Sequence, residues 1–173
     1  MNRLMLVLLW LGLCGAAPMG AQAVKLHPRL LLAGSLGVSA TPSLVTFALT
    51  KGGIAAGSQG ITIATTYTVN LASTIKLYAY FATSDALAGG GYTIPSANVF
   101  GQCTTGLPTS YTAFTQTGPF GASSSLEIYS QFLLVTLVGN RSDVLNLHID
   151  LTTLPLLAAG TYTGTLILQM QGM

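Results

Sequence analysis

Apolar and polar residues alternate with a period of two along most of the chain, the spacing that gives a β-strand one buried and one exposed face. The alternating segments are 30–38, 43–50, 59–71, 75–83, 125–138, 144–151 and 158–173. After the first 23 residues, no stretch keeps a helical period for three turns. The pattern therefore predicts an all-β protein.

The connections between these segments predict how the strands pair. The link at 72–74 is short, so segments 59–71 and 75–83 are expected to form a hairpin. A turn is predicted at 139–143, where Asp143 is expected to hydrogen-bond to its own backbone. Both predictions treat segments that are neighbours in sequence as neighbouring strands.

The middle of the chain has a less regular pattern. Residues 84–91 have room for one helical turn before three glycines, and residues 92–125 contain three prolines among many Gly, Ser and Thr residues. Short edge strands are expected there near 98–100 and 111–117. About eight or nine strands result, which is typical of an immunoglobulin-like antiparallel β-sandwich; a closed β-barrel or jelly roll is the alternative.

Residues 1–23 have the features of a secretory signal peptide. A positive charge precedes an apolar run at 4–13 that is too short to span a bilayer, and Ala21-Gln22-Ala23 is a suitable cleavage site. Cys14 offers an alternative, a lipid-modified N-terminus, but the bulky residue before it disfavours that processing. We expect one domain at 24–173, exported through a Sec-type signal to the periplasm, cell surface or medium.

Charged residues make up only 6% of the chain, against about 25% in an ordinary soluble domain. Without Arg3, the mature chain has five basic and four acidic residues, a net charge of +1. This balance predicts no nucleic-acid partner, and contact with a membrane only through the export signal. Because the surface is expected to be rich in hydroxyls, it has little electrostatic protection against self-association, which favours a structural role.

Few residues of the mature chain are suited to catalysis. Cys103 is its single cysteine, so it is expected to be free or to form a disulfide with another chain. His148 and Asp150 share a strand face with Asn146, but two ligands do not make a metal site, and a solvated face is preferred. The chain has no nucleophile elbow, metalloprotease motif or phosphate-binding loop. We therefore predict no enzyme, no metal site and no cofactor; a small hydrolase is the least favoured alternative.

The end of the chain contains a distinctive sequence phrase. Residues 145–173, LNLHIDLTTLPLLAAGTYTGTLILQMQGM, contain Leu154-Pro155 and then Ala159-Gly160-Thr161-Tyr162 before the final alternating strand. This arrangement resembles the C-terminal end of spore coat protein U and of fimbrial pilin-like secreted bacterial proteins. Gly172 stands where pilins usually have an aromatic residue.

The resemblance implies a β-sandwich that is completed by a strand from a neighbouring subunit or from a periplasmic chaperone. Two sets of residues are implicated in such assembly. The first strand contributes Leu30, Leu32, Gly34, Leu36 and Val38 as a candidate donor, and the terminal strand contributes Tyr162, Leu166, Leu168 and Met170. An ordinary first strand of the same domain is the alternative for the first set.

The function expected from these observations is a secreted or cell-surface structural or adhesive subunit, pilin-like and without catalytic activity. The alternative is a carbohydrate-binding module that uses an aromatic sheet face. Its candidate ligand residues are Tyr67, Tyr78 and Tyr80. Cross-strand packing or cover by a loop explains the same tyrosines without a ligand.

Overall fold

The structure of the chain is a computed structural model that describes residues 34–69, 72–119, 123–135, 137–154 and 156–173. The expected signal peptide at 1–23, Cys14, and the candidate donor residues Leu30 and Leu32 lie outside the described residues. The fold is therefore described from Gly34 onward.

The described residues form β-strands and one short 3-10 helix, with no α-helix among them. The elements are β1 (Ser35–Thr41), β2 (Ile54–Ala56), β3 (Ile61–Val69), β4 (Ser73–Tyr80), β5 (Asp85–Gly89), β6 (Tyr92–Pro95), η1 (Ser96–Asn98), β7 (Val99–Cys103), β8 (Thr112–Ala113), β9 (Ser125–Leu133), β10 (Leu137–Asp150) and β11 (Ile167–Gly172). The strand pairs within the described residues are antiparallel. The prediction of an all-β protein is confirmed.

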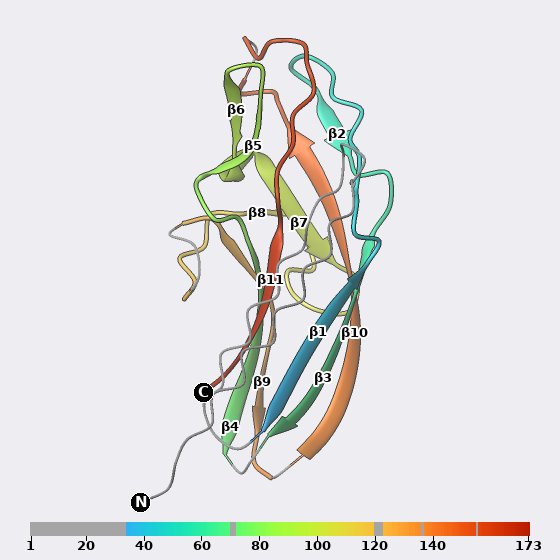
Figure 1. The fold of residues 1–173 in the computed structure, drawn as a ribbon, viewed down its shortest axis with the longest axis vertical. Coiled ribbons are helices and arrows are strands. Elements are labelled where there is room, and N and C mark those ends of the chain that lie inside the picture. The colour runs from blue at the N-terminus through green and yellow to red at the C-terminus, as the bar shows by residue number, and fades with distance from the viewer. Residues whose placement is uncertain (1–33, 70–71, 120–122, 136, 155) are drawn as a thin grey trace, which may run out of the picture.

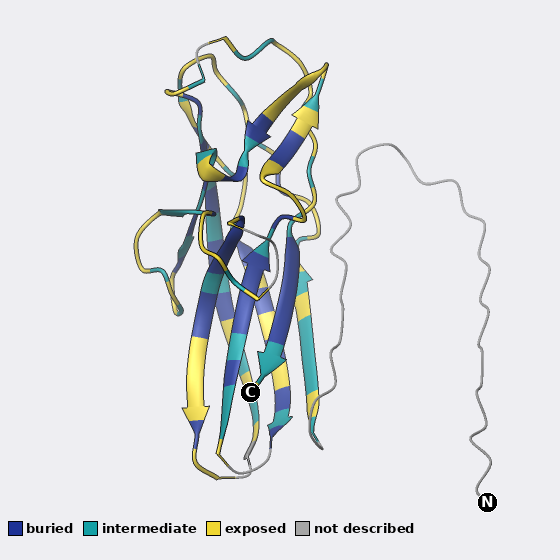
Figure 2. Ribbon diagram, turned by 90° about the vertical axis from the view of Figure 1, so that its left-hand side faces the viewer, coloured by how far each residue is buried: buried dark blue, intermediate teal, exposed yellow. Residues whose placement is uncertain are grey.

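The strands form antiparallel sheets (Figure 1). The larger sheet has the order β1-β3-β10-β7-β8, and β2 also pairs with β10. The smaller sheet has the order β11-β4-β9, and β5 and β6 form a hairpin of their own. Buried and exposed residues alternate along β3 (Figure 2).

One hydrophobic core takes side chains from both the larger and the smaller sheet. From the larger sheet, Ile63, Leu145 and Ile149 have no exposed surface. From the smaller sheet, Leu77 and Leu126 are equally buried. Burial of side chains of this size stabilises the folded chain by about 1.5–3 kcal/mol each, so the core shared by the two sheets holds the fold together.

The predicted hairpin between segments 59–71 and 75–83 is wrong. β3 pairs with β1 and β10 in the larger sheet, whereas β4 pairs with β9 and β11 in the smaller sheet. Ala72, with a φ of 57°, lies in the short link that carries the chain from one sheet to the other. Both strands direct apolar residues into the same core, and alternation alone does not distinguish this crossing from a hairpin.

The predicted turn at 139–143 is also wrong, because β10 runs without a break from Leu137 to Asp150. Its first part pairs with β3, and its second part pairs with β7 and β2. Gly139 fits inside this strand because the Tyr67 ring packs against it: a Cβ atom there would lie 2.6 Å from Tyr67 Cζ. The glycine that suggests a turn in the sequence therefore serves side-chain packing within a strand.

The segment 84–91 is a strand and a tight turn rather than a helical turn. β5 and β6 are joined at Gly90 and Gly91, whose φ angles of 57° and 82° favour glycine. Further along the chain, β8 is an edge strand as predicted, but β7 lies between β10 and β8 inside the larger sheet. The prolines and glycines of this region mark its turns without showing which strands lie inside a sheet.

Candidate functional site

Two segments with strand-like alternation, 43–50 and 158–166, line the same pocket and do not pair with each other. The strand predicted at 43–50 is not formed: within the described residues, its ladder contacts are limited to an isolated bridge from Phe47. Of the predicted terminal strand only β11 is regular, and residues 158–166 make an isolated bridge from Thr163 to β5. An alternating sequence forms a regular strand only where a partner backbone is present.

An apolar groove runs between these two segments. Its widest part is a pocket of about 410 Å³ between Phe47 on one side and Tyr162 on the other, and a pocket of about 210 Å³ continues it past Leu157. Toward β11, two small pockets of about 30 and 20 Å³ are both lined by Val45 and Leu166. Because neighbouring pockets have lining residues in common, they form one groove. The groove is defined here by Val45, Phe47, Leu49, Leu87, Ile149, Tyr162 and Leu166.

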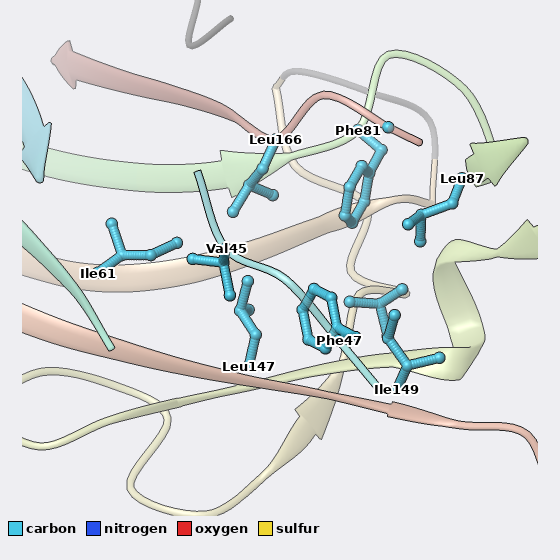
Figure 3. A pocket seen from close by; sticks show the side chains of 10 residues that line it. Val45, Phe47, Ile61, Phe81, Leu87, Leu147, Ile149 and Leu166 are labelled. Atoms are coloured by element: carbon cyan, nitrogen blue, oxygen red, sulfur yellow. The ribbon is translucent and has the colours of Figure 1, made fainter. Parts of the chain in front are cut away.

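Figure 3 shows the narrow part of the groove, where apolar side chains from several segments converge. Val45 and Phe47 come from the irregular segment, Leu166 from the chain leading into β11, and Leu147 and Ile149 from β10. Val45 is 4% exposed, whereas Phe47 and Leu166 are only partly buried. Apolar surface therefore remains available along the groove for a further apolar group.

At its narrow end the groove reaches the edges of both sheets, since Ala40 on β1 and Leu168 on β11 line its smallest pocket. β1 is an edge strand of the larger sheet and β11 an edge strand of the smaller sheet. The two strands are close, since a Cβ atom on Gly172 would lie 3.8 Å from Leu36 Cδ1, yet no ladder joins them within the described residues. Each edge presents N–H and C=O groups that a further strand would pair with.

The opposite side of the molecule, at β9 and β10, is closed by the loop after β7. Thr104 N donates to Val144 O on β10 at 3.1 Å, and Leu107 N donates to Ile128 O on β9 at 2.6 Å. Gly106 makes this close approach possible, because a Cβ atom there would lie 2.5 Å from Ile128 O. The loop therefore ties the larger and the smaller sheet together on this side.

An ion pair between the partly exposed Arg141 and the fully buried Asp143 holds the loop in place. Asp143 on β10 has no exposed surface, and Arg141 donates to both of its carboxylate oxygens at 2.7 Å, from Nε and from Nη2. Thr105 Oγ1 donates to the same carboxylate at 2.9 Å, and the Arg141 guanidinium lies 4.8 Å from the centre of the Tyr129 ring. Hydrogen bonding to Asp143 raises the pKa of Arg141. The prediction that Asp143 lies in a turn and hydrogen-bonds to its own backbone is therefore wrong.

Exposed and partly buried side chains alternate along residues 161–166 of the terminal segment, as a period of two predicts. The exposed residues are Thr161, Thr163 and Thr165, and the residues turned toward the groove or the core are Tyr162, Leu166, Leu168 and Met170. Gln169 is on the polar face but is nevertheless buried, and its Oε1 accepts a hydrogen bond from Tyr80 OH at 3.0 Å. Both faces of β11 are therefore covered, while one of its edges stays unpaired within the described residues.

The candidate donor residues that the structure describes belong to the first strand of the same domain. Leu36 pairs with Tyr67 and Val38 pairs with Thr65 in the ladder of β1 and β3. Gly34 comes directly before this strand. Leu36 and Val38 thus pair within their own chain. This agrees with the alternative prediction, that the segment is an ordinary first strand of the same domain.

The structure does not bring the three candidate ligand tyrosines together. Tyr67 lies on β3 in the larger sheet, and Tyr78 and Tyr80 lie on β4 in the smaller sheet. Tyr78 OH and Lys76 Nζ each donate to Glu127 Oε2 at 2.9 Å, and burial together with this hydrogen bond raises the pKa of Tyr78. Tyr78 is thus engaged in cross-strand packing, and an aromatic ligand face made of these three residues does not form.

His148 and Asp150 have partners other than a metal ion. Asp150 Oδ1 accepts hydrogen bonds from Thr152 N at 2.9 Å and Thr152 Oγ1 at 2.6 Å, and these lower the pKa of Asp150. The His148 ring lies against the rings of Phe100 and Tyr111. Among the described residues, no three His, Cys, Asp or Glu side chains are grouped so as to hold a metal ion. Sequence patterns miss the aromatic neighbours because they reach β10 only in the folded chain.

Cys103 is a buried free cysteine at the end of β7. It is 2% exposed, and burial, with a smaller contribution from Asp143, raises the pKa of its thiol to about 12. The thiol is therefore protonated near neutral pH, whereas the thiolate is the reactive form. A disulfide between Cys103 and another chain would require this part of the sheet to open first.

Native Cys103 is expected to resist thiol reagents. In the chain without residues 1–23, Ellman's reagent at about pH 8 should react with Cys103 about a hundredfold more slowly when the protein is folded than when it is unfolded in urea. The absorbance of the released thiolate measures both rates. A native reaction as fast as that of the unfolded chain would show that the end of β7 is open to solvent.

The chain matches no protein-family model, no curated protein and no solved structure. In the part of the chain that the structure describes, no helix has the length and apolar character needed to cross a membrane. The geometry of the groove is therefore the basis on which a function is inferred.

Proposed function

We propose that this protein is a secreted or cell-surface structural or adhesive subunit, pilin-like and without catalytic activity, whose groove binds a β-strand from a neighbouring copy. One observation carries the proposal. Two segments with strand-like alternation, 43–50 and 158–166, border an apolar groove and do not pair with each other. A strand placed between them would supply backbone partners to both, and its side chains would fill the pockets.

The lining of the groove suits an extended peptide. Apolar pockets follow one another from Leu166 past Phe47 and Tyr162 to Leu157. An extended chain places a side chain on one face every second residue, with backbone N–H and C=O groups at its edges. Both requirements of the groove, apolar contact and backbone pairing, are met by one strand.

The N-terminal end of the mature chain is the proposed donor. In an extended conformation, one face of residues 24–33 would present Val24, Leu26, Pro28, Leu30 and Leu32, and the other would present Lys25, His27, Arg29, Leu31 and Ala33. Ten such residues reach about 33 Å, enough to contact several pockets in succession. The donor has to end before β1, because Leu36 and Val38 are paired within their own chain. A periplasmic chaperone that lends a strand is the partner expected before assembly.

We also propose that the larger and smaller sheets form an immunoglobulin-like sandwich with room for one further strand on its open side. The shared core and the antiparallel strand orders support this arrangement. The resemblance of residues 145–173 to the end of pilin-like proteins supports it as well. In this arrangement the donated strand lies between segments 43–50 and 158–166, which line the widest pocket of the groove.

Deleting residues 24–33 is expected to convert polymers of the mature protein into monomers. Size-exclusion chromatography measures this change. A synthetic peptide of residues 24–34 should then raise the Tm of the deletion variant by about 5–10 °C at a hundredfold excess over its Kd, because a ligand that binds only the folded protein stabilises it.

Two matched controls accompany the deletion. A peptide with Leu30 and Leu32 replaced by Asp should leave the Tm unchanged, since a charge cannot enter an apolar pocket without a partner. The groove variant Leu166→Asp, made in the deletion background, should fold but lose its response to the native peptide, because Leu166 is only partly buried. A monomeric mature protein whose deletion variant shows no peptide-dependent change in Tm would contradict the proposal.

A further inference from the structure

Three aromatic rings form a row on the larger sheet, on a different face from the groove. The His148 ring on β10 lies against both Phe100, on β7, and Tyr111, the residue before β8. The ring centres are 4.8 Å apart for Phe100 and His148, and 4.2 Å apart for Tyr111 and His148. We call Phe100, His148 and Tyr111 the aromatic row.

The strand register positions two of these rings. Phe100 is directly opposite His148 in the ladder of β7 and β10. Their neighbours in sequence, Val99 and Ile149, are buried in the core at 2% and 0% exposure. Because side chains alternate along a strand, Phe100 and His148 point to the outer face of the sheet. Regular strands therefore hold both rings in place before any ligand arrives.

A loop places the third ring against the sheet. Gln102 on β7 anchors this loop, since Gln102 Nε2 donates to Thr109 O at 2.8 Å. Tyr111 follows at the end of the loop and is 42% exposed. An amphipathic ring of this kind offers an apolar face and a hydroxyl at the same surface.

Polar groups with spare hydrogen-bonding capacity lie beside the aromatic row. Asn146 is two residues before His148 on the same strand face and is paired with Gln102 in the ladder. Among the described residues, neither the Asn146 amide, the His148 ring nitrogens nor the Tyr111 hydroxyl has a hydrogen-bond partner. The surface thus combines the exposed part of the Tyr111 ring, packed on His148, with donors and acceptors that have no partner among the described residues.

We propose that the aromatic row and Asn146 bind a neutral polysaccharide of β-1,4-linked hexose units. The C–H face of a hexose ring stacks on aromatic side chains, and its hydroxyls hydrogen-bond to the groups that surround the row. A β-1,4-linked chain is flat and extended, so it suits the open outer face of a sheet better than a coiled sugar chain does. The site is separate from the groove and does not depend on strand binding.

The charge around the aromatic row favours a neutral ligand over an anionic one. Neither β2, β7 nor β8 contains a Lys or Arg residue, and the charged residue nearest to His148 on β10 is Asp150. Burial lowers the pKa of His148, so its ring is neutral near pH 7. Acidic polysaccharides and nucleic acids require cationic side chains, which this surface does not provide.

Titration of the purified protein with cellohexaose and with chitohexaose tests the proposal. Calorimetry should show about millimolar or tighter binding of at least one of these sugars. The same sugar should shift the NMR signals of the His148 ring. The variants Tyr111→Ala and Phe100→Ala should each weaken binding at least about tenfold, because each removes a stacking surface.

Tyr92→Ala is the matched control, because Tyr92 is 49% exposed but lies on β6, outside the aromatic row. Its affinity for the sugar should equal that of the unmodified protein. The proposal is overturned if neither sugar shifts the His148 signals, or if binding persists unchanged in Tyr111→Ala. A lower Tm of Tyr111→Ala without sugar binding by the unmodified protein would make the row a structural anchor for the loop, which also overturns it.

Discussion

Replacing Asp143 with alanine is expected to lower the free energy of unfolding by about 3–5 kcal/mol. The Asp143 carboxylate has no exposed surface, and it accepts hydrogen bonds from Arg141 Nε and Nη2 and from Thr105 Oγ1. Without it, the partly buried Arg141 guanidinium loses its counter-charge, and the loop that closes one side of the molecule loses its anchor. Urea unfolding monitored by circular dichroism measures the loss.

The control for this prediction is Lys76→Met, which breaks the ion pair between Lys76 and Glu127. Both of these side chains are about a quarter exposed, with relative areas of 26% and 25%, so solvent screens the pair. Its removal should change the free energy of unfolding by no more than about 1 kcal/mol. Equal effects of Asp143→Ala and Lys76→Met would show that burial of Asp143 does not govern stability.

Replacing Leu168 with aspartate is expected to abolish soluble folding. Leu168 is 2% exposed, lies in the hydrophobic core and belongs to β11, which pairs with β4. An unpaired carboxylate at this place would cost more than about 4 kcal/mol, a large part of the total stability of a domain. Soluble yield and the circular dichroism spectrum measure the outcome.

Thr165→Asp is the matched control for Leu168→Asp, since Thr165 is exposed and lies three residues earlier in the same segment. This variant should be soluble and as stable as the unmodified protein within about 0.5 kcal/mol. A well-folded Leu168→Asp protein would mean that β11 does not face the core.

Alternation in segment 144–151 shows how far the sequence alone can be interpreted. Leu145, Leu147 and Ile149 are buried, and His148 lies on the opposite face, as predicted. A strand sends neighbouring side chains to opposite faces whatever its partners are, so this property is local. The inward residues of this segment could therefore be predicted without knowledge of the fold.

Strand pairing could not be predicted in the same way. The sequence of β10 contains Gly139, Asn140 and Asp143, which are common in turns, yet the strand passes through all three. It does so because Tyr67 packs on Gly139, and because Arg141 and Thr105 satisfy Asp143 inside the protein. Tyr67 and Thr105 belong to other segments, so no local pattern contains them.

The candidate groove was predicted only in part. Tyr162 and Leu166 belong to the residues that the terminal pattern places on the inward face. Segment 43–50 has the same alternation, but in the fold it lies across an opening from 158–166 without a partner strand between them. The sequence thus identified the residues on one side of the groove, but it did not show that the two segments border a groove.

The sequence by itself determined that the chain is all-β and that Leu168 and Met170 face inward, because a period of two is a property of each strand alone. Only the tertiary structure decided that β3 and β4 lie in different sheets, that Asp143 is buried and bonded to Thr105, and that the groove stays open. These features depend on contacts between residues far apart in the chain, and the free energy of such contacts is set by packing rather than by any local pattern.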